Sequence, residues 1–142
     1  MIIGGIAAVL HGSAQNTFDL DVCYATDPGN LRALGHALIE LQAKLKGVQE
    51  DIPFTPDDRT LRRTEVLTME TAAGELDILA RPVGSPGYES LRRRADRFEL
   101  DGFSVLVASI DDLIQMKLAT GRLKDRAAVD ELHAIRRLRA PR

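Results

Sequence analysis

Two aspartates stand out in the stretch of residues 3–22, which reads IGGIAAVLHGSAQNTFDLDV. Asp19 and Asp21 are separated by one apolar residue, and strand residues two apart project to the same face. A strand over 18–24 would therefore carry both carboxylates on one side. Its other side is expected to pack in a core through the apolar residues Phe18, Leu20 and Val22.

Two neighbouring carboxylates repel each other unless a proton or a cation neutralises them. Their hard oxygen atoms suit Mg²⁺ or Mn²⁺. The spacing of Asp19 and Asp21 therefore favours a metal site, but by itself it also fits a strand with two solvated acids on its outer face.

The twin glycine, Gly4-Gly5, ends a short apolar strand over 2–4 and precedes a helix expected from Ile6 to Leu10. Glycine lets the backbone approach a ligand closely. The start of a helix offers free N–H groups and a positive dipole end, which favour phosphate. A phosphate cradle beside a pair of metal-binding acids is what a nucleotide-handling enzyme needs.

The order apolar-Gly-Gly, helix and Asp-x-Asp on the next strand resembles the signature of the DNA polymerase β-type nucleotidyltransferase superfamily. More narrowly, GGIAAVLHG followed by T-x-D-L-D is similar to the AbiEii/AbiGii-type toxin nucleotidyltransferases of bacterial toxin–antitoxin and phage-defence systems. Relatives often have an arginine where this chain has Gln15, and they usually carry a helix before the first strand. The resemblance thus implies that this helix is missing, which would expose an apolar N-terminal edge for a partner or a second copy to cover.

The rest of the chain alternates between helix and strand signals. Leucines at helical spacing predict a helix from Asn30 to Lys46, and the polar, proline-bearing segment 47–60 predicts a surface loop. Two hairpins are expected from strands over 63–70, 75–80, 98–100 and 104–107. Further helices are expected over 86–97, 110–120 and 126–138. This order predicts one mixed α/β (α+β) domain over residues 1–142, with a small central sheet flanked by helices and with C-terminal helices.

Composition narrows the class of protein. A hydrophobic content of 44% and a charged content of 28% are ordinary for a globular domain. No apolar run approaches the roughly 20 residues of a membrane span, so no membrane partner is expected. The single cysteine, Cys23, cannot form an internal disulfide, and we expect a reducing cytoplasm.

Charge is spread unevenly along the chain. Residues 1–58 hold 3 Lys/Arg and 8 Asp/Glu, whereas residues 113–142 hold 8 and 3. An acidic part facing a basic part suits a phosphate-rich ligand between them. A solvated basic C-terminal helix is an equally good explanation of the second count.

Asp77 lies on the predicted strand 75–80 between the apolar Leu76 and Ile78, which is consistent with a third carboxylate beside the first two. In the superfamily a third Asp on a nearby strand completes the metal site and helps to deprotonate the attacking hydroxyl, and Asp77 matches it by order and context. The alternative is a solvent-facing strand acid. Glu75 shares the same face and is the spare candidate.

Lys117 falls on the apolar face of a helix that Ser109 and Asp112 predict to begin near Ile110. A lysine on such a face is unusual without a partner, and a phosphate would be a good one. The alternative is a lysine that covers the edge of the core and keeps its charge in water. The segment GRLKDRAAVDEL that follows also resembles the family motif.

Three other polar residues receive secondary roles. Ser13 is expected to donate to a phosphate. His11 is expected to pack or to support a neighbouring group rather than to bind a metal. Asp125 is expected to cap the last helix.

Together with the resemblance, these residues imply a metal-dependent nucleotidyltransferase, which moves a nucleoside monophosphate from a nucleoside triphosphate (NTP) to an acceptor hydroxyl and releases pyrophosphate. The catalytic and metal-binding residues would be Asp19, Asp21 and Asp77, with Mg²⁺ or Mn²⁺ as the cofactor. The nucleotide-binding residues would be Gly4, Gly5, Ser13 and Lys117.

The acceptor implied by the resemblance is RNA, such as the tRNA 3′ end, or a protein hydroxyl, and a cognate antitoxin would be a partner. The basic stretches over 92–94 and 136–139 favour nucleic acid. Two alternatives remain open. One is a non-catalytic nucleotide- or partner-binding protein that keeps the fold, and the other is a small-molecule, antibiotic-type nucleotidyltransferase.

Overall fold

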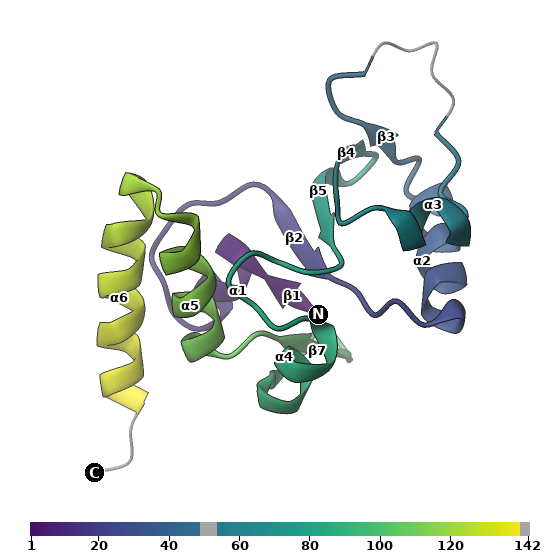
Figure 1. The fold of residues 1–142 in the computed structure, drawn as a ribbon. Coiled ribbons are helices and arrows are strands. Elements are labelled where there is room, and N and C mark those ends of the chain that lie inside the picture. Colours follow the sequence, from purple (N-terminus) through teal and green to yellow (C-terminus); the bar gives the residue numbers. More distant parts are fainter. Residues whose placement is uncertain (49–53, 140–142) are drawn as a thin grey trace.

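The computed structural model describes residues 1–48 and 54–139. Strands that lie between residues 2 and 107 join in one mixed sheet (Figure 1). Within these residues the sheet has seven strands in the order β3-β4-β5-β2-β1-β7-β6. The strands are β1 (Ile2–Ile3), β2 (Leu20–Cys23), β3 (Lys44–Leu45), β4 (Val66–Thr71), β5 (Gly74–Leu79), β6 (Asp96–Leu100) and β7 (Phe103–Val107).

Helices lie on both sides of this sheet, and two of them end the described chain. They are α1 (Gly4–Leu10), α2 (Pro28–Glu40), α3 (Asp58–Arg63), α4 (Tyr88–Arg94), α5 (Ile110–Thr120) and α6 (Leu123–Arg139). The expected mixed α/β fold, with a small sheet flanked by helices and with C-terminal helices, is confirmed. No helix among the described residues is long and apolar enough to cross a membrane.

Strands β1, β2 and β5 form the centre of the sheet. Strand β2 runs antiparallel to β1 and parallel to β5, while β1 runs parallel to β7. The hairpins β4–β5 and β6–β7 extend the sheet on either side. Because β1 lies between β2 and β7, the N-terminal strand is not an edge of the sheet.

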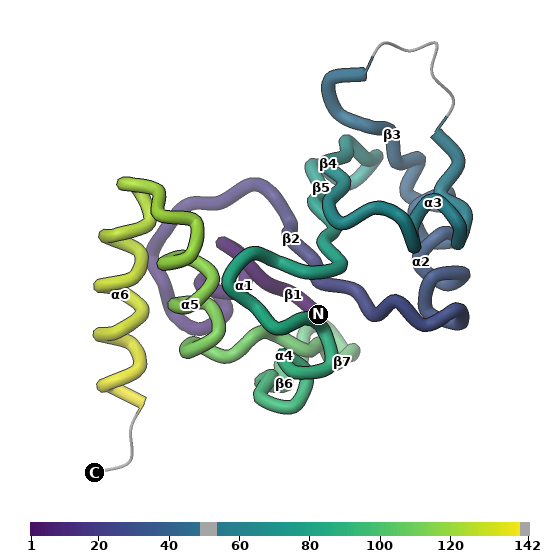
Figure 2. Tube along the Cα trace, viewed as in Figure 1, coloured from purple at the N-terminus to yellow at the C-terminus, as the bar shows by residue number. Residues whose placement is uncertain are grey.

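Two hydrophobic cores lie on the two faces of the sheet. The first joins the sheet to α1, α4, α5 and α6 and contains Cys23, while Val22 packs against the second, which joins the sheet to α2 and α3. Figure 2 shows the same division, with α5 and α6 on one side of the sheet and α2 and α3 on the other. Alternating residues of β2 thus serve opposite faces, as the pleat of a strand requires.

The helix expected over 30–46 is shorter and begins earlier. The side chain of Asp27 accepts from the backbone N–H of Asn30 at 3.0 Å and caps α2. Gln42 then adopts a positive φ of 53°, and the chain enters β3 instead of continuing as helix. Leucine spacing could not reveal this, because Leu45 pairs with β4 in the sheet.

The loop expected over 47–60 is only partly a loop. Residues 49–53 lie outside the described part of the chain. Helix α3 begins at Asp58, since the side chain of Asp57 accepts from the backbone N–H of Thr60 at 2.7 Å.

Other boundaries also differ from expectation; for example, β4 begins at Val66 and not at residue 63, which ends α3. Helix α1 begins at Gly4, two residues early, and α4 ends before Asp96, which pairs in β6. Helix α6 begins at Leu123, so Asp125 lies inside its first turn and is not its cap. Helix α5 has the predicted bounds, and Ser109 accepts from the backbone N–H of Asp112 at 3.1 Å, as the capping pattern predicted.

Candidate functional site

Four carboxylates line two adjacent strands on the face of the sheet that carries α1 and α5. The parallel register of β2 and β5 places Asp21 opposite Asp77. Asp19, just before β2, lies next to Glu75, the residue two before Asp77, and the two carboxyl groups can share a hydrogen bond when one of them is protonated. The acids thus form two cross-strand pairs, Asp21 with Asp77 and Asp19 with Glu75, and we call them the carboxylate square.

The first turn of α1 covers the inner pair of the square. Ile3 is the register partner of Asp21, and the chain turns into the helix at Gly4, whose φ is +66°. A Cβ atom on Gly4 would lie 2.0 Å from Oδ2 of Asp21, so only glycine leaves room for this carboxylate. The backbone N–H of Gly5 donates a hydrogen bond to the same group.

The surroundings of Asp21 disfavour the ionised form of its carboxyl group. Burial, followed by the charge of Asp77, raises the pKa of Asp21 from 3.8 to about 6, and Asp19 adds a smaller effect. The hydrogen bond from Gly5 and the charge of Lys117 act in the opposite direction. Burial and the neighbouring carboxylates thus disfavour the ionised form of Asp21, and a bound cation would stabilise that form.

The outer pair is held by a lysine that follows β3. Lys46 Nζ lies 2.6 Å from Glu75 Oε1, and this hydrogen bond lowers the pKa of Glu75, with a smaller contribution from the bond to Asp19. The bond with Glu75 in turn raises the pKa of Asp19. Sequence reasoning missed Lys46, because it was assigned to the end of a helix and nothing in its neighbourhood marks the contact.

Lys117 lies at the other side of the square, on α5. Its side chain is 16% exposed, and its Nζ lies 3.6 Å from Oδ1 of Asp125. The other oxygen of Asp125, Oδ2, accepts a hydrogen bond from Thr120 Oγ1 at 2.8 Å. Asp125 thus supplies the negative charge that a largely buried lysine needs. The charge of Lys117 still lowers the pKa of Asp21, so the lysine is part of the electrostatic surroundings of the site.

The remaining candidates have other contacts. Ser13 donates through Oγ to Glu131 Oε2 at 2.6 Å, so its hydroxyl is engaged with α6. His11 is buried, and its Nε2 lies 2.8 Å from the carbonyl oxygen of Ala108, which confirms a packing role. A Cβ on Gly5 would meet Oγ1 of Thr17 at 2.5 Å, so Gly5 also needs to be small.

Phe18 contradicts its predicted place in the core. Its side chain is 90% exposed, and Leu20 is 37% exposed. The regular strand begins only at Leu20, so the alternation that would bury Phe18 does not extend to it. Val22, in the middle of β2, packs against the second core as expected.

Half of the arginines in the two basic stretches have partners within the chain. Arg94 pairs with Asp112 through Nη2 and Oδ1 at 2.5 Å, and Arg136 pairs with Asp111 at 2.6 Å. Arg139 Nη1 lies 2.9 Å from His11 Nδ1. These three residues tie helices together, so they are poor candidates for binding a nucleic acid.

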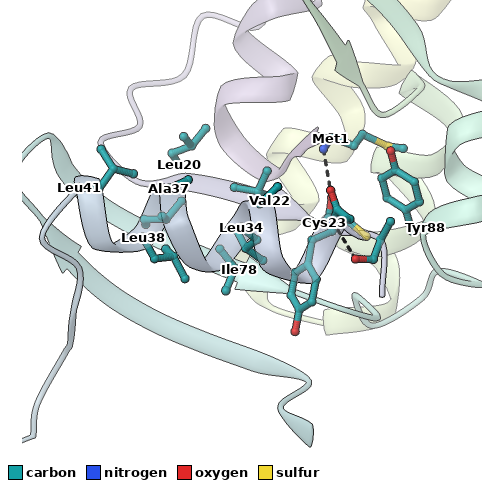
Figure 3. A pocket seen from close by; sticks show the side chains of 15 residues that line it. Met1, Leu20, Val22, Cys23, Leu34, Ala37, Leu38, Leu41, Ile78 and Tyr88 are labelled. Atoms are coloured by element: carbon teal, nitrogen blue, oxygen red, sulfur yellow. Dashed lines mark hydrogen bonds between the residues drawn. The ribbon is translucent and has the colours of Figure 1, made fainter. Parts of the chain in front are cut away.

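An apolar groove of about 360 Å³ lies between α2 and the sheet (Figure 3). Its walls include Leu20, Val22, Leu38 and Ile78, which alternate with the acids along β2 and β5 or come from α2. The groove and the carboxylate square therefore belong to opposite faces of the same strands. At the end of the groove the amino group of Met1 donates to the carbonyl oxygen of Cys23 at 3.0 Å.

The donor chemistry of the square fits a hard divalent cation. Every side chain in it offers carboxylate oxygens, the ligands that Mg²⁺ and Mn²⁺ prefer. In the described residues no three acidic, histidine or cysteine side chains converge on one point as closely as the ligands of a bound metal do. Coordination of one ion by Asp19, Asp21 and Asp77 would therefore require their side chains to move closer together.

Comparison with known proteins identifies no family model that matches this chain, and no curated protein matches it.

Proposed function

We propose that this chain is a metal-dependent nucleotidyltransferase, which transfers a nucleoside monophosphate from an NTP to an acceptor hydroxyl. The observation that carries the proposal is the register of β2 and β5, which sets Asp21 opposite Asp77 against the first turn of α1. The resemblance of residues 3–22 to the nucleotidyltransferase signature supports the same assignment.

In the proposed reaction the acceptor oxygen attacks the α-phosphorus of the NTP. The new P–O bond forms as the bond from the α-phosphorus to the bridging oxygen breaks, and pyrophosphate leaves with that electron pair. The carboxylate of Asp77 accepts the proton of the attacking hydroxyl. Mg²⁺ held by Asp19, Asp21 and Asp77 would supply positive charge to the triphosphate and lower the pKa of the hydroxyl.

The other residues position the donor nucleotide. Gly4 and Gly5 keep the backbone of α1 close to the acids, so that a phosphate can approach without meeting a side chain. Lys117 contributes positive charge on the side of the square that faces α5. Ser13 would join them only if its hydroxyl left Glu131.

We propose that the reaction takes place in the cytoplasm, because a chain with a single cysteine, Cys23, needs no oxidising compartment for an internal disulfide. RNA, for example the tRNA 3′ end, is the acceptor that the resemblance favours. A toxin role with a cognate antitoxin rests on that resemblance alone.

The test is an incubation of the protein with each α-³²P-labelled NTP, Mg²⁺, total tRNA and cell lysate. The proposal predicts label on RNA or on a protein, and label on a small molecule would assign the small-molecule branch instead. The label should disappear when EDTA replaces Mg²⁺. Failure of all four nucleotides to label any acceptor would favour the non-catalytic alternative.

A further inference from the structure

The carboxylate square already has a positively charged group beside it, the ammonium group of Lys46. Its Nζ lies 2.6 Å from Oε1 of Glu75, and the carboxyl group of Asp19 lies next to that of Glu75. Lys46 follows the two-residue strand β3 and reaches the square from outside β2 and β5. The ammonium thus occupies the place beside the outer pair that a second cation would otherwise take.

Lys46 is held by a backbone hydrogen bond, while its side chain makes an ion pair that is open to water. The backbone N–H of Lys46 donates to the carbonyl oxygen of Thr68 at 2.9 Å, which anchors the residue to β4. The side chains of Lys46 and Glu75 are 41% and 42% exposed. An ion pair this open to water is worth little by itself, so a divalent cation can displace it.

Lys46 and a metal ion would be attracted to the same outer pair. The ammonium group of Lys46 is bound to Glu75 and lies near Asp19, the proposed metal ligand. A divalent cation that binds Asp19 would therefore come close to this ammonium group, and the two positive charges repel each other.

We propose that Lys46 competes with the divalent cation for the Asp19–Glu75 pair and thereby sets the metal affinity of the site. This inference rests on the proposed function, because it takes Asp19 as a metal ligand. It adds a residue that weakens metal binding in the free protein. When the metal binds, the released ammonium lies at the mouth of the site, where the triphosphate enters.

The test measures binding of Mn²⁺ alone, by electron paramagnetic resonance of the free ion, to the wild-type protein and to Lys46→Met. The inference predicts that Lys46→Met binds Mn²⁺ about 5-fold or more tightly at low salt, and that the difference shrinks as salt is added. Lys46→Arg, which keeps the charge, should bind Mn²⁺ within about 2-fold of the wild type.

Lys44→Met is the matched control. Lys44 belongs to β3, two residues before Lys46, and is exposed. Among the described residues its side chain makes no hydrogen bond or ion pair with Asp19 or Glu75. Its removal should change Mn²⁺ affinity by less than about 2-fold. A similar gain in Lys44→Met would mean that net charge, and not the contact with Glu75, determines the effect.

The outcomes separate the two proposals. If the wild type binds Mn²⁺ and transfers nucleotide but Lys46→Met binds the metal equally or more weakly, the competition inference is wrong and the proposed function stands. If neither protein binds Mn²⁺ and the wild type transfers nothing, both are wrong. A raised KM for the NTP in Lys46→Met, together with tighter Mn²⁺ binding, would support the released ammonium as a triphosphate contact.

Discussion

Gly4 and Asp21 share one space: a Cβ atom on residue 4 would lie 2.0 Å from Oδ2 of the aspartate. The side chain of Asp21 therefore needs a residue without a Cβ atom at position 4, whether or not a phosphate also approaches the helix. The backbone N–H of Gly5 donates to the same carboxylate. The two glycines and Asp21, which lies 16 residues after Gly5, thus form one structural unit.

Replacement of Gly4 tests this unit. Gly4→Ala introduces a side chain at φ +66°, which costs roughly 1–2 kcal/mol in backbone strain, and it also displaces Asp21. We expect a lower free energy of unfolding in urea and a loss of Mn²⁺ binding. Gly121→Ala is the matched control, since Gly121 has φ +64° and nothing within 4 Å of an added Cβ. It should lose stability but keep Mn²⁺ affinity; equal metal binding by both variants would contradict the steric argument.

The raised pKa of Asp21 predicts a pH-dependent stability difference. The pKa of Asp21 is about 6 in the folded protein, against 3.8 in the unfolded chain, so the folded protein keeps this proton to a higher pH. As pH rises from about 4 to above 6, ionisation therefore destabilises the fold, by about 3 kcal/mol in order of magnitude. Asp21→Asn lacks this cost, so its stability relative to the wild type should increase over that interval.

Urea unfolding of both proteins at pH 4.5 and pH 7.5 measures the effect. Saturating Mg²⁺ at pH 7.5 should stabilise the wild type and leave Asp21→Asn nearly unchanged. A constant difference between the two proteins at both pH values would show that Asp21 ionises normally.

Substitutions of Phe18 and Leu31 test the placement of β2 and α2. Leu31 is fully buried, whereas Phe18 is 90% exposed. Leu31→Ala should lower the free energy of unfolding by about 2–5 kcal/mol, and Phe18→Ala should change it by less than about 0.5 kcal/mol. If Phe18→Ala lowered the free energy of unfolding by several kcal/mol, Phe18 would have to be buried in the core.

Cys23 reports on the burial of β2. Its side chain is fully buried, and burial raises the pKa of the thiol to about 11. At pH 8 only roughly a thousandth of the thiol is ionised, so alkylation should be slow in the folded protein and fast in urea. Since Cys23 is the single cysteine, the rate of iodoacetamide labelling measures this site alone. Rapid labelling of the native protein would contradict a buried β2.

The sequence predicted those parts of the fold that depend on local patterns. The helix from Ile110 to Thr120 followed from its capping pair, and the two hairpins followed from alternation around glycine turns. It failed where pairing decides the structure. Leucine spacing continued α2 through Leu45, but that residue is recruited by β4.

The same limit applies to the candidate site. Asp21 and Asp77 were identified from alternation along their own strands, and the register between those strands brought them together. The contacts of Lys46 with Glu75 and of Lys117 with Asp125 join different elements. No pattern within one segment encodes such contacts, so only the assembled sheet and helices reveal them.

The most direct test of the central claim is the rate of α-³²P transfer by the wild type and by Asp21→Asn, with Mg²⁺ at saturation. The matched control is Asp130→Asn, which removes an exposed carboxylate from α6. Asp21→Asn should lose about 100-fold or more in rate because it removes a charged metal ligand, while its circular dichroism stays native and Asp130→Asn keeps the wild-type rate. Transfer by Asp21→Asn at the wild-type rate would contradict the assignment of the carboxylate square as the catalytic metal site.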